Sequence, residues 1–574
     1  MAVEFLRFAF GSLILLIPGI WLAGAFSIGA DRVERWTYGS CIGLAGAVYL
    51  ASVISHFDLR WFYPIWVVVA AACLGLGIAR AKKRTDHPTR SNGWILAILI
   101  LVAVTRFAAA LPQALPEGPF DPTFHLVLAE KIRLAHHSIS DWRPFESIAL
   151  NYPTGSHTLL VVLAAFSRLP LETVFKDFIP LLGVLSTAQI YLFARRAAGD
   201  ESVAIWSAAA YGLWAWFGSI DYYRWGGLPN ELGMLFLLAM LTLWLHSAPI
   251  AVRVLLMALM FAGVILVHSH VAVVGGLLLA VLLIVPPSRF NAASMRSVLA
   301  MAVIAALALD APFLVSYAMK ISLLHSTTVL HNSEPPLKIL DILRGIGFVN
   351  APAALAGLVI LLAKRRPRFH PILFCALGTL AGAFLATEYL IPMLMQAFGK
   401  PPAIALAPSR FLTDLNYFLP LLAGSFLTFI QSSLKITRPW LLAAICVAGL
   451  ADYRQWRRLF VPDDVVPPGF VQACRWIRDH TPSSTVVLNR DDWTTYLTWR
   501  RATFTPLPDS EAVVDHAAVL NRLGEIMSGE IPPDSPDMKI VKIVPIDAPA
   551  AQPVLWRDSD FKVIQVWSAP RHGS

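Results

Sequence analysis

Residues 118–157 read GPFDPTFHLVLAEKIRLAHHSISDWRPFESIALNYPTGSH and form a polar island between strongly apolar segments. The ionisable side chains of this island include Asp121, His125, Glu130, Lys131, His136, His137, Asp141, Arg143, Glu146 and His157. Charged groups are costly inside a bilayer, so a segment of this kind between long apolar runs indicates a loop at a membrane surface. Much of the remaining chain then serves as the scaffold that holds this loop.

The composition indicates a polytopic α-helical membrane protein. Of the 574 residues, 57% are hydrophobic and only 14% are charged, whereas about a quarter are charged in a typical soluble protein. Apolar runs close to the ~20 residues that span a bilayer recur along the chain and predict about 14 transmembrane helices. The predicted spans are 5–27, 36–55, 62–79, 93–112, 172–194, 202–220, 230–247, 252–268, 270–286, 297–318, 345–363, 370–392, 409–431 and 438–452.

The basic loops predict the orientation of these spans. The net charge of +9 arises largely from short loops between spans, so we interpret it as an orientation signal rather than a nucleic-acid patch. The loop at 80–90 is rich in Lys and Arg and is therefore expected to be cytoplasmic. Five later clusters of Lys and Arg fall on the same side of the membrane as this loop if residues 156–169 do not cross it. We therefore expect 156–169 to be interfacial or re-entrant and the 113–157 loop to be extracytoplasmic.

The tail after residue 453 differs in composition from the rest. Its apolar runs shorten to strand length at 484–489 (STVVLN), 538–544 (MKIVKIV) and 561–567 (FKVIQVW), around a helix-like segment at 468–480. We predict a small extracytoplasmic α/β domain at 454–574. It follows a transmembrane module at 93–453 and N-terminal transmembrane helices at 1–92.

Asp121 is the first candidate for chemistry. It lies four residues before His125, so the two side chains share one face of a helical turn. A carboxylate at a membrane surface can accept a proton or bind a divalent cation. Since Asp before Pro is also a common helix N-cap, the two interpretations stay open.

Glu231 is the second candidate. It lies in SIDYYRWGGLPNELG, residues 219–233, where Pro229 and Asn230 begin the next span. A glutamate at the mouth of a membrane helix needs a partner, a cation or water. The alternative is an acidic residue stabilised by the helix macrodipole.

These motifs resemble the GT-C membrane glycosyltransferases. FDPTFHLVLAEKI followed by NYPTGSH is similar to the first external loop of that superfamily, in the arrangement of the oligosaccharyltransferase catalytic subunit. GGLPNELGMLFLL resembles the second acidic motif, with Pro229 in place of the first acid. The tail lacks the Trp-Trp-Asp motif, so the resemblance implies a GT-C fold and a lipid-linked donor, not sequon glycosylation. Residues 5–79 look like an N-terminal addition.

The resemblance implies roles for individual residues. Asp121 would be the base that activates the acceptor or a ligand of Mg or Mn, and Glu231 a second acid on the same centre. Arg410 would bind the donor phosphate with its guanidinium fork, an alternative being an interfacial anchor. His268 and His270 are further candidates for phosphate, with interfacial packing as the alternative. The candidates for substrate binding are His125, His157, Tyr152, Asp221, Arg224 and Trp225, although aromatic residues at this depth also form interfacial belts.

Together these features predict a glycosyltransferase that inverts configuration and moves a sugar from a polyprenyl phosphate to an extracytoplasmic glycan, lipid or protein. The enzyme would lie in a prokaryotic cytoplasmic membrane. No P-loop or dinucleotide fingerprint occurs, in keeping with a reaction without a nucleotide cofactor, and no nucleic-acid partner is expected. The alternative hypotheses are a transporter or flippase of lipid or polysaccharide precursors, and a non-catalytic assembly protein.

Overall fold

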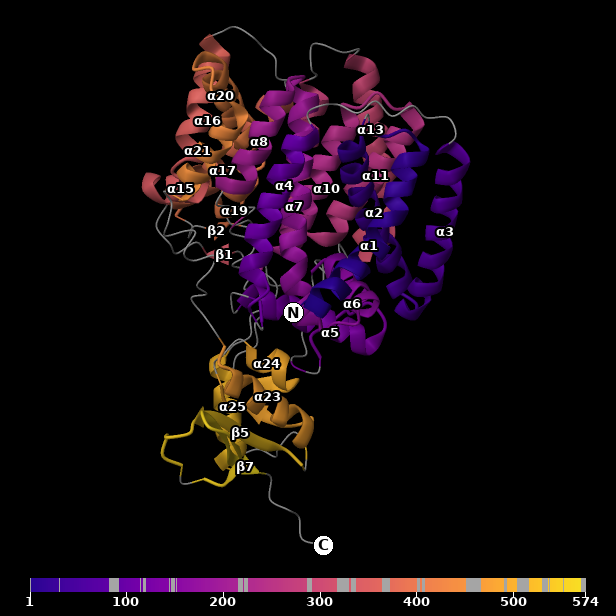
Figure 1. The fold of residues 1–574 in the computed structure, drawn as a ribbon. Coiled ribbons are helices and arrows are strands. Elements are labelled where there is room, and N and C mark those ends of the chain that lie inside the picture. The colour runs from indigo at the N-terminus through magenta and orange to yellow at the C-terminus, as the bar shows by residue number, and fades with distance from the viewer. Residues whose placement is uncertain are drawn as a thin grey trace.

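The computed structural model is a bundle of helices with a small sheet-containing tail at one end (Figure 1). It describes residues 2–29, 31–81, 92–113, 115–116, 120–143, 145, 150, 152–214, 220, 226–285, 292–316, 330–331, 337–363, 372–399, 403–404, 408–450, 466–489, 493–502, 516–528, 535, 537–550 and 552–568.

The first half of the chain is helical. Its elements are α1 (Ala2–Ala25), α2 (Arg32–Ser55), η1 (Leu59–Trp61), α3 (Phe62–Ala81), α4 (Asn92–Ala110), α5 (Phe120–Ala135), α6 (Gly155–Ser167), α7 (Leu171–Ala198), α8 (Glu201–Trp214), α10 (Leu228–Trp244), α11 (Ile250–Val267), α12 (Ser269–Ile284) and α13 (Ala292–Leu309).

The second half of the bundle has shorter helices and one small sheet. Its elements are β1 (Leu330–His331), α15 (Ile339–Ile346), α16 (Asn350–Ala363), α17 (Ile372–Leu385), the π-helical turn η3 (Ala386–Leu390), α18 (Ile391–Ala397), β2 (Ala403–Ile404), α19 (Pro408–Leu415), α20 (Leu419–Ser433) and α21 (Arg438–Leu450). β1 and β2 pair antiparallel.

The apolar helices confirm a polytopic membrane protein. Seven described helices are long and apolar enough to span a bilayer, or eight if the bent pair α15 and α16 forms one span. Five further apolar helices among the described residues have 10–17 residues. The count of about 14 spans stays a prediction, as does the expectation that 156–169 does not cross. The 13 residues of α6 extend only ~20 Å, which favours that expectation because the hydrocarbon core is ~30 Å thick.

Helices at the edge of the bundle differ from those at its centre. α3 exposes Val67 and Val68, and α4 exposes Ile100 and Val104. Exposed apolar side chains on helices of this length are what contact with lipid tails requires. In contrast, every residue of α10 is buried.

The N-terminal helices pack tightly into the bundle. α1 and α2 approach so closely that a Cβ placed on Gly19 would lie 2.1 Å from the carbonyl oxygen of Gly39, as in membrane helix pairs with small residues at the crossing. Arg195 of α7 also donates to the buried Asp31 before α2 at 2.7 Å. α1 and α2 are therefore an integral part of the bundle, while the interpretation of residues 5–79 as an N-terminal addition to the GT-C layout stays a prediction.

Three of the predicted spans differ from single regular α-helices in the structure. α15 and α16 meet at 87°. The span predicted at 370–392 extends to Ala397 through the π-helical turn. The span predicted at 409–431 is two helices, α19 and α20, because the chain turns at residues 416–418.

The tail contains the predicted strands. Its elements are α23 (Pro468–His480), β3 (Val486–Val487), α24 (Trp493–Thr498), β4 (Arg501–Ala502), α25 (His516–Ser528), β5 (Lys539–Pro545), β6 (Val554–Arg557) and β7 (Phe561–Ser568). The five strands form one sheet in the order β4-β3-β5-β7-β6, with β3 parallel to β4 and β5 and the remaining pairs antiparallel. The domain divisions at residues 92 and 453 stay a prediction.

The tail lies against the end of the bundle that carries α5 and α6 (Figure 1). The Arg478 guanidinium is 3.1 Å from the Glu130 carboxylate of α5. Tyr496 donates its hydroxyl hydrogen to Glu172 of α7 at 2.7 Å. The tail and the 118–157 stretch therefore share one end of the bundle, as the sequence predicted.

Candidate functional site

α5 begins at the motif that the sequence singled out. The helix starts at Phe120, so Asp121 lies in its first turn rather than at the N-cap. An acidic side chain is stable there because the first backbone N–H groups of a helix carry partial positive charge. Asp121 and His125, four residues apart, both belong to this helix, in agreement with the prediction of a shared face.

His125 is joined to His157 of α6. Their ring nitrogens Nδ1 and Nε2 are 2.9 Å apart, and both rings are buried. The backbone carbonyls of Thr154 and Pro153 lie near His157 and favour a ring hydrogen directed at them, and the Ser156 hydroxyl lies 3.4 Å from its Nδ1, where it can accept. A neutral imidazole has one N–H, so His157 accepts at Nε2 and His125 donates from Nδ1. This assignment leaves Nε2 of His125 as an acceptor.

α19 faces the break between α11 and α12 with two polar contacts. Arg410 Nη1 lies 3.2 Å from Nε2 of His268, and Asp414 Oδ2 lies 2.9 Å from Nε2 of His270. Arg410 and Asp414 are one helical turn apart, so both face the same way. His268 can face Arg410 because its backbone is extended and caps α12 rather than continuing α11.

The charge of Arg410 connects the two halves of the site. Burial raises the pKa of Asp121 to about 6, and the positive charge of Arg410 limits the rise. Burial also lowers the pKa of His125 well below its ordinary value, with further lowering by His157 and Arg410. Arg410 therefore lies close enough to act on both side chains of α5.

Tyr152 connects these groups. Its ring centroid lies 5.7 Å from that of His157, 5.9 Å from that of His125 and 6.1 Å from that of His268. The structure thus brings together six of the sequence-predicted residues, namely Asp121, His125, Tyr152, His157, His268 and Arg410. We call these six residues the polar site.

Glu231 lies in a neighbouring cluster. It is buried in the first turn of α10, and Tyr211 donates a hydrogen bond to its Oε1 at 3.2 Å. The start of α10 nevertheless touches the start of α5. Gly226 has φ +78°, and a Cβ placed on it would lie 2.6 Å from Cγ of Pro122. Among the described residues, no hydrogen bond or ion pair joins Glu231 to Asp121.

Several residues around both clusters are not among the candidates that the sequence predicted. Asp414 binds His270, while Tyr417 packs against Tyr211 with ring centroids 5.2 Å apart. Arg106 of α4 is fully buried and acts on Glu231 through its charge. An arginine inside an apolar span is a signal that could have identified Arg106. Three of the predicted site residues, Asp221, Arg224 and Trp225, lie outside the described residues.

The described residues do not provide a metal-ligand set. No group of three or more His, Cys, Asp and Glu side chains that could hold a metal ion occurs within the described ranges. The cation whose charge acts on Asp121 is the Arg410 guanidinium. The described part of the chain therefore does not support the expected roles of Asp121 and Glu231 as ligands of Mg or Mn.

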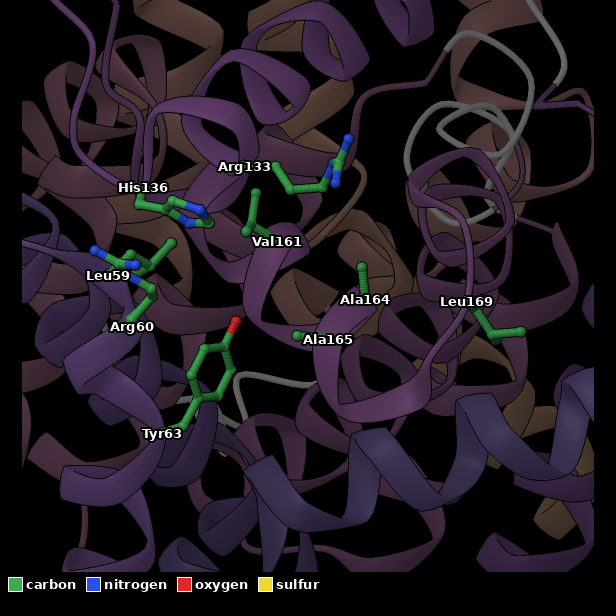
Figure 2. Close-up of a pocket in the computed structure, with 9 residues that line it drawn as sticks. All are labelled: Leu59, Arg60, Tyr63, Arg133, His136, Val161, Ala164, Ala165 and Leu169. Atoms are coloured by element: carbon green, nitrogen blue, oxygen red, sulfur yellow. The ribbon is translucent and has the colours of Figure 1, made fainter.

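Outside the polar site, residues of η1, α3, α5 and α6 line a hollow (Figure 2). It has a volume of about 320 Å³, and Arg60, Tyr63, Arg133 and His136 contribute its polar groups. Both arginines already have carboxylate partners, Arg60 with Asp58 at 2.6 Å and Arg133 with Glu130 at 2.6 Å. We therefore do not assign the donor phosphate to this hollow.

Comparisons with known proteins give matches in structure but not in sequence. No family model matches the chain, and neither does any curated protein. The fold is similar to that of ArnT from Cupriavidus metallidurans bound to undecaprenyl phosphate, with a TM-score of 0.57 and 15% identity over 82% of this chain and 98% of that chain. It is also similar to the arabinofuranosyltransferase AftD from Mycobacteria, with a TM-score of 0.52 and 14% identity over 85% of this chain and 41% of that chain. Archaeal oligosaccharyltransferase AglB from Archaeoglobus fulgidus superimposes with a TM-score of 0.48 and 14% identity over 72% of this chain and 64% of that chain. This chain is an integral membrane protein with the GT-C fold.

Proposed function

We propose that this protein is a membrane glycosyltransferase that moves a sugar from a polyprenyl-phosphate-linked donor to an acceptor outside the cytoplasm. The observation that carries the proposal is the contact between Arg410 and His268, at the end of the bundle where the charge of Arg410 also acts on Asp121. The similar structure of ArnT has undecaprenyl phosphate bound, which supports a donor of this class.

Arg410 and His268 are the proposed phosphate-binding pair. The backbone N–H of Val271 points to Nδ1 of His268 at 3.4 Å, and Arg410 donates toward Nε2. A neutral imidazole has only one lone pair for hydrogen bonding, so it cannot accept both hydrogen bonds at once. If Nδ1 accepts, Nε2 carries a hydrogen, and two donors then face each other. A phosphate oxygen between them would accept from both, and charge-assisted hydrogen bonds of this kind are strong.

Asp121 is the proposed general base. In this scheme an acceptor hydroxyl attacks the anomeric carbon and its proton moves to Asp121. The bond between the anomeric carbon and the phosphate oxygen breaks, and its electron pair leaves with the lipid phosphate on Arg410 and His268. A direct attack of this type inverts the anomeric configuration. A pKa of about 6 leaves Asp121 ionised at neutral pH while raising its basicity above that of an exposed aspartate.

The remaining site residues have supporting roles in this proposal. His125 offers Nε2 to an acceptor hydroxyl, and His157 holds the tautomer that makes this possible. His270 is held by Asp414 and orients the start of α12. Glu231 stabilises the start of α10 beside Pro122 through Tyr211. We place this site and the tail outside the cytoplasm and the protein in a prokaryotic cytoplasmic membrane.

The proposal is tested by following release of the lipid. Purified full-length protein would be incubated with synthetic undecaprenyl-phosphate sugars and a cell-envelope extract as the source of acceptor. We expect Asp121→Asn to lower the release of undecaprenyl phosphate by about 100- to 10,000-fold, the range for loss of a general base. It should still bind undecaprenyl phosphate.

Asp141→Asn is the matched control. Asp141 lies in the same external region and pairs with Arg143 at 2.5 Å rather than with the polar site. We expect this variant to turn over at the wild-type rate. Wild-type release by Asp121→Asn would contradict the proposed role of Asp121. Transbilayer movement of the lipid-linked sugar without release would favour the transporter.

A further inference from the structure

A cavity of about 430 Å³ shares the Tyr152 side chain with the polar site. Its walls come from the end of α2, the external loop before α6, the break between α11 and α12, and the residues that follow α13. The volume lies within the range of about 300–1,000 Å³ that is usual for small-molecule sites. The cavity is therefore large enough for a ligand of its own.

Hydroxyl groups supply much of the polar surface of this cavity. α2 contributes Ser52 and Ser55, the external loop contributes Ser138 and Ser140, and α12 begins with Ser269. The Ser52 side chain is 4% exposed, and its Oγ has no hydrogen-bond partner among the described residues. A buried hydroxyl without a partner costs free energy, and a ligand that supplied one would remove that cost.

The described lining contains no Lys, Arg, Asp or Glu, and its one imidazole, that of His56, has its Nδ1 3.3 Å from the Ser138 hydroxyl. A phosphate, a carboxylate or an ammonium group would therefore lose its hydration here without gaining an opposite charge. Tyr152 and Phe313 add aromatic surface, and sugar C–H groups pack well on such rings. Hydroxyl groups that both donate and accept, next to aromatic rings and without charges, match an uncharged sugar ring.

The cavity shares walls with the polar site. Tyr152 belongs to both, Ser269 directly follows His268, and the carbonyl of the lining residue Thr154 lies near His157. A ring bound in the cavity would therefore lie next to the groups that we assign to transfer.

We infer that this cavity binds a neutral glycosyl unit of one of the two substrates. The inference rests on the proposed function for the identity of the substrates, but the binding itself does not require turnover. Because α2 supplies Ser52, the N-terminal helices would take part in choosing the sugar.

Direct titration tests the inference. Purified full-length protein would be titrated calorimetrically with glucose, galactose, mannose and arabinose, and with glucuronic acid and glucosamine as charged counterparts. We expect saturable binding of at least one neutral sugar and at least tenfold weaker binding of the charged ones. Absence of saturable binding by every neutral sugar would overturn the inference.

Variants at Ser52 connect the binding to this cavity. Ser52→Leu removes the hydroxyl and fills part of the space, so we expect at least tenfold weaker binding. Ser52→Ala removes the hydroxyl but leaves the space open, so it should weaken sugar binding about fivefold. This variant keeps the test valid if Ser52→Leu does not fold. Ser432→Leu, at an exposed position near the end of α20, should bind the sugar like the wild type. Wild-type affinity in both Ser52 variants would overturn the inference.

Two further measurements identify the occupant. If Ser52→Leu weakens binding of undecaprenyl phosphate instead of sugar, the cavity holds the lipid chain and the inference is wrong. In the release assay, Ser52→Leu should raise the KM of the acceptor if the sugar belongs to the acceptor, or that of the donor if it belongs to the donor. Unchanged KM values for both would overturn the inference. Failure of the wild type to bind undecaprenyl phosphate would instead remove the proposed function, while the sugar titration would still report on the cavity.

Discussion

Neutralising Asp121 should stabilise the protein while it abolishes transfer. The carboxyl has a pKa of about 6 in the folded protein, against an ordinary value of 3.8. At 1.36 kcal/mol for each pH unit, this rise corresponds to up to about 3 kcal/mol. Because the folded state holds the proton more tightly than the unfolded state, stability is lost as the pH rises from about 4 to about 6. Asparagine does not titrate, so Asp121→Asn avoids this loss.

The assay is thermal unfolding of purified protein in detergent between pH 4.5 and pH 8. We expect Asp121→Asn and the wild type to unfold at nearly the same temperature at the acid end, and the variant to unfold at a higher temperature at pH 8. Asp141→Asn is again the control. Its hydrogen bond with Arg143 lowers the pKa of Asp141, so neutralising it should not stabilise the protein. A difference for Asp121→Asn that is independent of pH, or a variant less stable at pH 8, would refute this reasoning.

Three further predictions follow from the site and the tail. Arg410→Ala should weaken binding of undecaprenyl phosphate by at least tenfold. Arg410→Lys, which keeps the charge but not the planar fork, should weaken it less. Equal affinity of the wild type and both variants would show that Arg410 does not bind the phosphate. The rate of transfer should rise with pH through about 6 and then level off, since only ionised Asp121 accepts a proton; a rate that falls over this interval would contradict the role of base. Tyr496→Phe combined with Arg478→Ala should make the tail more sensitive to limited proteolysis, because the hydrogen bond to Glu172 and the ion pair with α5 are lost; an unchanged cleavage pattern would show that neither contact holds the tail.

The elements that rest on local pattern could be predicted from the sequence. The strands at 539–545 and 561–568 and the helix at 468–480 lie where alternation and helical spacing placed them. Asp121 and His125 lie four residues apart in one continuous segment, so a local prediction of helix was enough to place both in α5. Apolar runs located most spans for the same reason.

The partners across the bundle could not be predicted, and one break in a helix was overlooked. The turn at 416–418 divides a predicted span into α19 and α20, and its local signals are Asn416 and Pro420, which lies in the first turn of α20. The pairing of His270 with Asp414 joins positions 144 residues apart, and only tertiary packing determines such contacts. The sequence grouped Glu231 with Asp121 by motif but gave no sign of its hydrogen bond with Tyr211 of a neighbouring helix, and a centre shared with Asp121 stays a prediction.

The docking of the tail on α5 has a thermodynamic consequence. One helix carries Asp121 in its first turn and Glu130, the partner of Arg478, nine residues later, about 13 Å along the axis. If docking of the tail changes the position of this helix, substrate affinity and docking are linked. A substrate that binds more tightly to the docked form must then favour docking by the same factor. Measuring proteolysis of the tail with and without undecaprenyl phosphate would therefore report substrate occupancy from the opposite end of the helix.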